Sequence, residues 1–302
     1  MSESTVSEVA SGEPAGDGAF ASPADAAARL AAVRYLTDEA IATTVFLAQA
    51  LGKPLLVEGP AGVGKTELAK AVAAATGSEL IRLQCYEGLD EARALYEFNY
   101  KKQLLAIQAA PEDRAWQETH DDIFSEEFLL ERPLLAAIRR TGPTVLLIDE
   151  ADKADVEVEG MLLEVLSDFQ VTIPELGTVE AVRRPFVLIT SNAARELSEA
   201  LKRRCLYLHL DYPAPERERD IVLAQVPGIE AELAEQLVRT VGTLRALEVK
   251  KAPSIAETVD WARTLLALGL DDLDEAAVAR TLGVVLKHAS DQERATKELG
   301  LG

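Results

Sequence analysis

The sequence predicts an α/β fold built on a parallel sheet, followed by a separate all-helical domain. Five short apolar segments of strand length alternate with helical segments over residues 55–210. One of them, TVLLIDE at residues 144–150, contains an unbroken apolar run, which is typical of a strand buried on both faces of a parallel sheet. After Pro213, four helical segments follow with no strand between them.

The composition is that of a folded and strongly acidic chain. Its 302 residues are 48% hydrophobic with a net charge of −20, which allows one large or two modest domains. The acidic balance opposes a broad nucleic-acid surface, which needs clustered Lys and Arg. Cys85 and Cys205 form no CxxC motif, so we expect buried thiols rather than a disulfide framework or zinc site. No apolar run approaches a membrane span and no signal pattern is present, so a cytoplasmic protein is expected.

The first 28 residues are predicted to form a disordered tail. They are rich in Ser, Glu, Gly, Ala and Pro and almost without large apolar side chains. Helical periodicity begins near Leu30, and a clear helix starts at residues 37–39 and ends at a Gly52 cap. The expected organisation is therefore a tail over 1–28, an α/β core over 29–212 and a helical domain over 213–302.

The segment between the second and third core strands is predicted to contain a helix and an irregular insert. Apolar residues recur at helical spacing over residues 84–108 and predict one helix, either packed on the core or projecting toward a partner. Residues 111–127 are predicted to be a loop or irregular insert. His120, Asp121 and Asp122 in it are interpreted as a solvated acidic turn, because no second ligand cluster accompanies them.

Two further core segments have clear local patterns. Residues 128–140, FLLERPLLAAIRR, predict a helix that is closed by Gly142-Pro143. Residues 170–184, QVTIPELGTVEAVRR, predict two short strands around a turn that contains Pro and Gly, and hence a hairpin.

A glycine-rich stretch, GPAGVGKT, joins the first strand to the next helix with the spacing of a phosphate-binding P-loop. Glycines without a Cβ let the backbone N–H groups point inward at an anion, and the helix dipole adds positive charge there. In this interpretation Lys65 reaches the outer phosphates and Thr66 ligates Mg²⁺. A glycine turn that binds nothing is the weaker alternative. The predicted phosphate-binding residues are Gly59, Pro60, Ala61, Gly62, Val63, Gly64, Lys65 and Thr66.

Polar residues end two of the core strands. Asp149 and Glu150 follow the most apolar strand, at the edge where parallel sheets bind ligands. Asp149 is suited to hold Mg²⁺ through water, and Glu150 to orient an attacking water, although two acids there could also cap the next helix. Asn192 ends the next core strand, where its amide could hold that water or the terminal phosphate, or cap a helix.

Paired arginines, Arg203 and Arg204, lie between a polar helical segment and the fifth strand. One of them could act as an arginine finger across a subunit boundary, where an added cation accelerates phosphoryl transfer. The alternative is solvated surface charge, which is common for paired arginines.

With these motifs in place, the chain resembles the AAA+ ATPases and, within them, the MoxR family. The resemblance covers residues 33–268 and rests on GPAGVGKT, on VLLIDE, on TSN ending at Asn192 and on LKRRCLYLHL. The hairpin over 170–184 is similar to one found in the helicase-like branch. CYEGLDEARALYEFNYKKQLL and FLLERPLL resemble the subgroup that accompanies carbon-monoxide-dehydrogenase-type molybdenum enzymes.

This resemblance implies a five-stranded sheet of order 5-1-4-3-2 with a helical lid, and Mg²⁺-dependent ATP hydrolysis between core and lid. It also implies a homo-hexameric ring, a partner with a von Willebrand A domain and a metalloenzyme client. One departure stands out: Ala256 occupies the position of the family's sensor-2 arginine, with Lys250 and Lys251 as the nearby cations.

The favoured hypothesis is an ATP-hydrolysing chaperone, and other classes stay open. A nucleotide-switched scaffold with little turnover is slightly favoured by Ala256. A nucleic-acid motor has some support from Arg183 and Arg184 near the hairpin but is opposed by the acidic charge. A small-molecule kinase fits poorly with the helical lid and the Asn192 strand.

Overall fold

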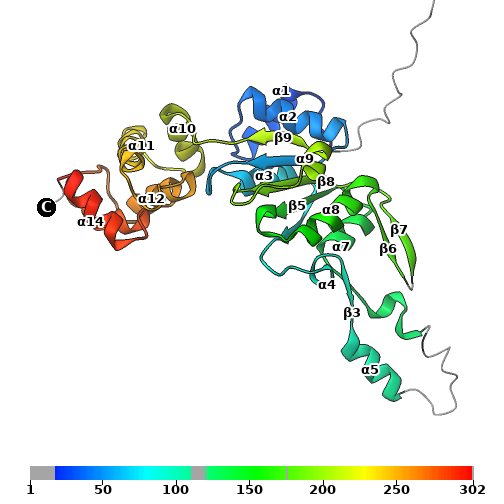
Figure 1. Ribbon diagram of the computed structural model, residues 1–302. Coiled ribbons are helices and arrows are strands. Elements are labelled where there is room, and N and C mark those ends of the chain that lie inside the picture. Colours follow the sequence, from blue (N-terminus) through cyan, green and yellow to red (C-terminus); the bar gives the residue numbers. More distant parts are fainter. Residues whose placement is uncertain (1–17, 110–119, 121, 175, 301–302) are drawn as a thin grey trace, which may run out of the picture.

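The computed structural model describes residues 18–109, 120, 122–174 and 176–300 (Figure 1). Its centre is a five-stranded sheet in the order β2-β5-β8-β1-β9, the predicted 5-1-4-3-2 arrangement. All four strand pairings in it are parallel. The strands are β1 (Leu55–Glu58), β2 (Glu79–Gln84), β5 (Thr144–Asp149), β8 (Phe186–Ser191) and β9 (Leu206–His209).

Side chains alternate between the two faces along each strand, and both faces are buried at the centre of the sheet. All six residues of β5 are buried. Leu147 and Leu188 belong to one hydrophobic cluster, while Leu146 and Ile148 belong to a second cluster on the opposite face. The parallel register brings the carboxyl ends together, with Gln84 opposite Asp149. The polar residues that end these strands therefore meet at one edge of the sheet.

Helices cover each face of the sheet. Buried residues of α1 (Pro23–Ala32), α2 (Glu39–Ala50) and α3 (Lys65–Thr76) join the first cluster. Those of α7 (Pro133–Arg139), α8 (Val156–Asp168) and α9 (Glu199–Arg204) join the second. Figure 1 shows the resulting three-layer core.

The predicted disordered tail is too long. Residues 1–17 lie outside the described part of the chain, but residues 20–28 do not form a tail. Helix α1 begins at Pro23, capped by the Ser22 side chain, and Phe20 and Leu30 are buried in the first cluster. Arg29 also donates hydrogen bonds to the Ala75 carbonyl at the end of α3. The composition misled because Ala-rich helices need few large side chains when they pack closely.

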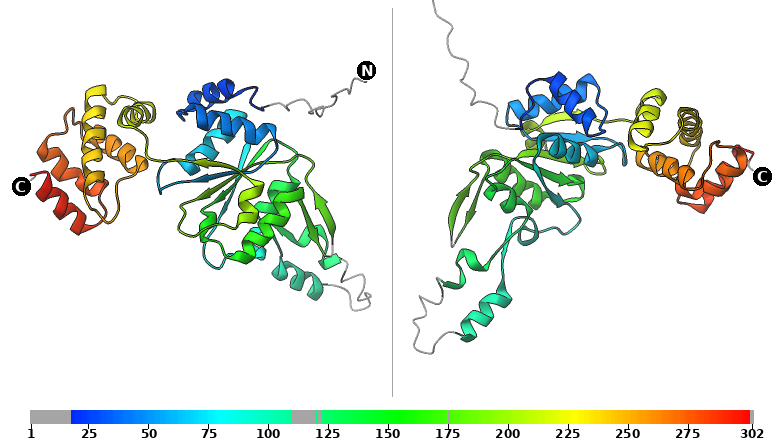
Figure 2. Two further views of the ribbon diagram at one scale, coloured as in Figure 1. Left: turned by 45° about the horizontal axis from the view of Figure 1, so that its top comes forward. Right: turned by 180° about the vertical axis from the view of Figure 1, so that it is seen from behind.

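The single helix predicted over residues 84–108 is wrong. The segment contains the short helix α4 (Glu91–Ala94), strand β3 (Tyr96–Phe98) and helix α5 (Tyr100–Ala109). The prediction for residues 128–140 is half wrong, because η1 (Glu126–Phe128) and strand β4 (Leu129–Glu131) precede α7. β3 and β4 pair antiparallel, a long-range partnership that local periodicity does not reveal. With α5 they form an arm that projects from the core (Figures 1 and 2).

The hairpin over residues 170–184 is confirmed. β6 (Gln170–Ile173) pairs antiparallel with β7 (Gly177–Glu180). Val171 and Ile173 point into the second cluster and anchor the hairpin to the core.

The C-terminal part is helical, as predicted, and lies on the opposite side of the core from α5 (Figure 2). The last of the four predicted helical segments corresponds to α13, which ends at Thr281 and continues as a 3-10 turn. A further helix, α14, was not predicted. The elements are α10 (Pro215–Gln225), α11 (Ala231–Ala246), α12 (Ile255–Ala267), α13 (Glu275–Thr281), η3 (Leu282–Val284) and α14 (Ala289–Glu298).

Both cysteines are free thiols, and Cys85 is buried as expected, whereas Cys205 is only partly buried. Burial raises the pKa of Cys85 and of Cys205 to about 12. No helix among the described residues has both the length and the apolarity that a membrane crossing requires. The described residues also contain no group of three His, Cys, Asp or Glu that could hold a metal ion. Asp121, part of the predicted acidic turn, lies outside them.

Candidate functional site

The P-loop lies between β1 and α3 in a conformation that requires glycine. Gly59, Gly62 and Gly64 have positive φ angles of 152°, 76° and 100°. A Cβ on Gly59 would lie 1.9 Å from the Leu210 carbonyl oxygen, and one on Gly62 would lie 2.3 Å from the Ser254 Cβ. The loop is thus pressed against both the end of β9 and the start of α12.

Lys65 is a buried cation at the N-terminus of α3, with 6% of its surface exposed. Its ammonium donates to the carbonyls of Gly59 and Pro60, both at 2.7 Å, and to Asn192 Oδ1 at 2.8 Å. Burial lowers the pKa of Lys65, while the neighbouring carboxylates of Asp152 and Asp149 oppose this shift. A desolvated cation beside N–H groups of a glycine turn is suited to hold an anion.

Asp149 ends β5 and its side chain is almost fully buried. Its Oδ1 accepts hydrogen bonds from Thr66 at 3.0 Å and from Thr190 at 2.6 Å. Arg82 donates to Oδ2 from Nε at 3.0 Å and from Nη2 at 2.6 Å. The structure therefore brings Thr66 and Asp149 together as predicted. Their hydroxyl and carboxylate oxygens form the hard donor set that suits Mg²⁺.

Glu150 adopts the left-handed conformation, with φ 57° and ψ 49°, which is uncommon outside glycine. Its backbone N–H donates to Thr190 Oγ1 at 2.8 Å. Its carboxylate accepts from Gln84 Nε2 at 2.8 Å, from Lys153 Nζ at 2.7 Å and from Asn192 Nδ2 at 3.3 Å. The side chain is thereby held at the edge of the sheet.

Asn192 bridges the two charged groups, because its Oδ1 accepts from Lys65 and its Nδ2 donates to Glu150. The alternative interpretation as a helix cap does not hold, since the cap of the next helix, α9, is Ser198. The buried carboxylate of Asp152 accepts the backbone N–H groups of Asn192 at 3.2 Å and Ala194 at 3.0 Å. Asp152 thus shapes the loop that carries Asn192.

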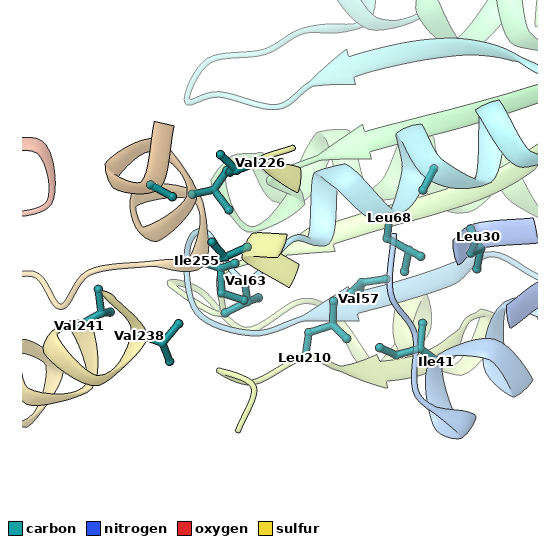
Figure 3. Packing of buried hydrophobic residues seen from close by; sticks show 14 of the residues in the cluster. Leu30, Ile41, Val57, Val63, Leu68, Leu210, Val226, Val238, Val241 and Ile255 are labelled. Atoms are coloured by element: carbon teal, nitrogen blue, oxygen red, sulfur yellow. The ribbon is translucent and has the colours of Figure 1, made fainter. Parts of the chain in front are cut away.

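A cavity of about 820 Å³ lies between the core and the C-terminal helices, within the usual range for ligand pockets. The segment between α1 and α2 and the helices α10 and α12 form its remaining walls. Val63 of the P-loop and Ile255 of α12 lie close together beside it in the first hydrophobic cluster (Figure 3). Its polar core lining includes Lys65, Thr66, Asp149, Glu150, Thr190 and Asn192.

The paired arginines lie outside this cavity. Both are exposed at the end of α9. Arg204 donates to Ser167 Oγ at 2.9 Å and to the Ala200 carbonyl at 3.3 Å. Arg203 makes no hydrogen bond or ion pair with the described residues, so its guanidinium is the freer of the two. Neither can serve its own chain's cavity in this arrangement.

Ala256 lines the cavity from the first turn of α12. Neither Lys250 nor Lys251 lines it, and Lys251 pairs with Glu257 at 3.0 Å. The cations that the C-terminal helices bring to the cavity are Arg217 and Arg263.

Several residues of the site were missed by sequence reasoning. Arg82 and Gln84 both touch the acidic pair, and their i, i+2 spacing on a strand was the available signal. Thr190 and Asp152 are recognisable only once the loops are placed. Tyr35 donates to the Gly64 carbonyl at 3.4 Å, and burial raises its pKa.

Residues 54–205 match the family model of the AAA domain, dynein-related subfamily. The chain belongs to the AAA+ ATPases. It is 26% identical over 238 residues to the denitrification regulatory protein NirQ of Pseudomonas aeruginosa, covering 76% of this chain and 82% of NirQ. It is 26% identical to protein NorQ of Paracoccus denitrificans, with 76% and 80% covered, and to protein CbbQ of Hydrogenophilus thermoluteolus, with 61% and 62% covered.

These relatives are MoxR-family AAA+ ATPases, which agrees with the resemblance found in the sequence motifs. The chain is a nucleotide-binding P-loop ATPase. Proteins of the AAA+ family generally form oligomeric rings.

Proposed function

We propose that this AAA+ ATPase is a Mg²⁺-dependent chaperone that remodels or activates a client enzyme, in the maturation of a metallocofactor enzyme. The observation that carries the proposal is the continuous hydrogen-bonded chain from Lys65 through Asn192 to Glu150, beside the Thr66–Asp149 pair. Binding, metal and water-activating groups thus meet at one sheet edge, which is what nucleotide hydrolysis requires.

The residues present fit a magnesium triphosphate. The P-loop N–H groups and Lys65 would hold the phosphates, and Thr66 and Asp149 would hold Mg²⁺. Bound Mg²⁺ would neutralise phosphate charge and so ease attack at the terminal phosphorus. Glu150 would orient and polarise the attacking water, and Asn192 would keep Glu150 and Lys65 in register.

We place the complete site at a subunit junction of a homo-hexameric ring, with one arginine of a neighbouring copy reaching the terminal phosphate. Arg203 and Arg204 are candidates for this role, because both are exposed and both lie outside the cavity of their own chain. Arg203 is the favoured candidate, because its guanidinium makes no hydrogen bond or ion pair with the described residues. Arg204 would first have to break its hydrogen bond to Ser167.

The partner and the client follow from the resemblance. A protein with a von Willebrand A domain is the proposed partner. The printed name of NirQ, denitrification regulatory protein, supports a role in the service of another enzyme system. The subgroup motifs over residues 85–105 and 128–135 support a molybdenum-enzyme client. Two free thiols are compatible with action in the cytoplasm.

The experiment is the replacement Glu150→Gln, with turnover and ATP affinity measured separately. We expect turnover to fall by about a hundredfold or more with ATP affinity retained, because the amide keeps its hydrogen-bonding shape but cannot polarise water. Glu157→Gln, an exposed acid in the first turn of α8, is the matched control and should hydrolyse ATP normally.

Two outcomes would contradict this proposal. Tight ATP binding by the wild type with no measurable turnover, alone or with its partner, would favour the nucleotide-switched scaffold. Turnover that rises on addition of DNA and falls steeply with salt would favour the nucleic-acid motor.

A further inference from the structure

Arg82 is the one cation that contacts the buried Asp149 carboxylate among the described residues. It lies on β2, the edge strand of the sheet. Its Nε and Nη2 both donate hydrogen bonds to Asp149 Oδ2, at 3.0 and 2.6 Å. The side chain of Asp149 is 3% exposed, whereas that of Arg82 is 50% exposed. A half-solvated cation therefore reaches in from the sheet edge to an enclosed anion.

The two oxygens of Asp149 have different partners. Oδ1 accepts short hydrogen bonds from Thr66 and Thr190. Oδ2 accepts both bonds of Arg82 and a longer one, 3.4 Å, from Thr66. Thr66 and Thr190 are neutral, so in the described part of the chain only Arg82 compensates the charge of Asp149 by direct contact.

We propose that Arg82 is a positioning residue that competes with Mg²⁺ for Asp149 Oδ2 and so sets the Mg²⁺ concentration at which nucleotide binds. This inference rests on the proposed function, since Thr66 and Asp149 are the metal-binding residues there. Two cations close to one carboxylate repel each other strongly when the site is partly desolvated. Mg²⁺ therefore binds more tightly when the guanidinium is absent.

The surroundings of Arg82 allow it to give way. Half of its side chain is already in solvent, and its Nη2 also contacts Gln84 Oε1 on the same strand. Gln84 in turn donates to Glu150. Displacement of Arg82 would thus alter the hydrogen bonds of Glu150, the residue proposed to orient water. Strand β2 therefore connects the metal-binding residue Asp149 with Glu150.

The test is a Mg²⁺ titration of the binding of a fluorescent, non-hydrolysable ATP analogue, followed by anisotropy. We expect Arg82→Gln to reach half-maximal Mg²⁺-dependent binding at about tenfold lower Mg²⁺ than the wild type. Arg82→Lys, which keeps the charge but not the planar fork, should lie between them.

Arg140→Gln is the matched control. Arg140 is also half-exposed and pairs with Glu79 at the opposite end of β2, so the variant removes the same charge far from Asp149. Its Mg²⁺ dependence should equal that of the wild type.

Thermal unfolding without Mg²⁺ supplies a second readout. Arg82→Gln should unfold at a lower temperature than the wild type, because a buried carboxylate loses its cation, and Mg²⁺ with the analogue should stabilise this variant more than the wild type. If Arg82→Gln does not fold, the shift is read from Arg82→Lys.

The inference is overturned if the Arg82 variants need the same or more Mg²⁺ than the wild type and Arg140→Gln. Failure of the nucleotide site on which the proposed function rests has a different signature. The wild type would then bind neither the analogue nor ADP, with Mg²⁺ or with a chelator, and all variants would be equally inert.

Discussion

The two walls of the cavity, one from the core and one from the C-terminal helices, differ in how their polar side chains are arranged. On the core side, charged and polar side chains bond to one another and face the cavity, with Lys65, Asn192 and Glu150 forming a chain. On the side of the C-terminal helices, α12 presents the apolar residues Ile255, Ala256 and Val259, and the charged residues Arg217, Asp260 and Arg263 also line the cavity. The core wall is therefore a connected polar network, whereas the helical wall mixes apolar side chains with separate charges.

The helical region has its own buried polar network, but this network lies behind the wall. Arg245 of α11 forms a two-pronged ion pair with Glu218 of α10, at 2.5 and 2.8 Å. Thr258 of α12 donates to the same carboxylate at 2.7 Å, and the Arg245 guanidinium lies 4.7 Å from the Tyr212 ring centroid. The charges of the core wall thus line the cavity, whereas those of the Arg245–Glu218 network connect three helices.

The largest effect should come from breaking the internal network. Arg245→Ala leaves the carboxylate of Glu218, which is 1% exposed, without a compensating cation, although Thr258 still donates a hydrogen bond to it. Loss of one member of a buried pair costs about 3–5 kcal/mol of the free energy of unfolding. Urea denaturation followed by circular dichroism measures this loss.

The control for that variant is Arg239→Ala on the same helix. Arg239 pairs with Glu235 at 3.7 Å and both side chains are mostly exposed, so its loss should cost less than about 1 kcal/mol. Equal costs for the two variants would show that Arg245 and Glu218 do not stabilise the helical region.

The next largest effect concerns the core wall. Lys65→Ala removes the buried ammonium at the P-loop, and ATP affinity should fall by about a hundredfold, or about 2.7 kcal/mol. Calorimetric titration with ATP checks this expectation. Lys70→Ala, on the exposed face of the same helix, should bind normally. Wild-type affinity in Lys65→Ala would mean that the core wall is not the phosphate site.

The smallest effect should come from adding a further cation to the helical wall. Ala256→Arg places this cation in the first turn of α12, at a position that lines the cavity. We expect ATP affinity to rise a few-fold, about 1 kcal/mol, with a smaller gain for ADP, because the added charge favours the more anionic ligand. Ala256→Gln, which adds length without charge, should leave both affinities unchanged. A gain with Gln as large as with Arg would point to packing instead.

Local patterns were reliable wherever one segment determines its own structure. Strand β5 and the glycine turn between β1 and α3 agree with the predictions, because apolar runs and glycine requirements act over a few residues. The arm was different. β3 and β4 are separated by about 30 residues, and each is only three residues long. Strands of three residues are too short to show an alternating pattern of their own and form only by pairing with each other. The apolar spacing of the first of them therefore predicted a helix instead.

The candidate site divides in the same way. Lys65, Thr66, Asp149, Glu150 and Asn192 were expected from motifs, and the structure brings them into contact. Arg82 and Asp152 were not expected, although they hold Asp149 and the Asn192 loop. Their roles depend on which residue faces them across the sheet.

By itself, the sequence determined that this protein has a parallel sheet with a phosphate-binding loop, because strand burial and glycine geometry are local properties. Only the tertiary structure decided which charges neutralise one another. Arg82 and Asp149 are 67 positions apart, and they meet because β2 and β5 pair in one register. A hydrogen bond depends on distances of a few tenths of an ångström, and distances between remote residues exist only once the chain has folded.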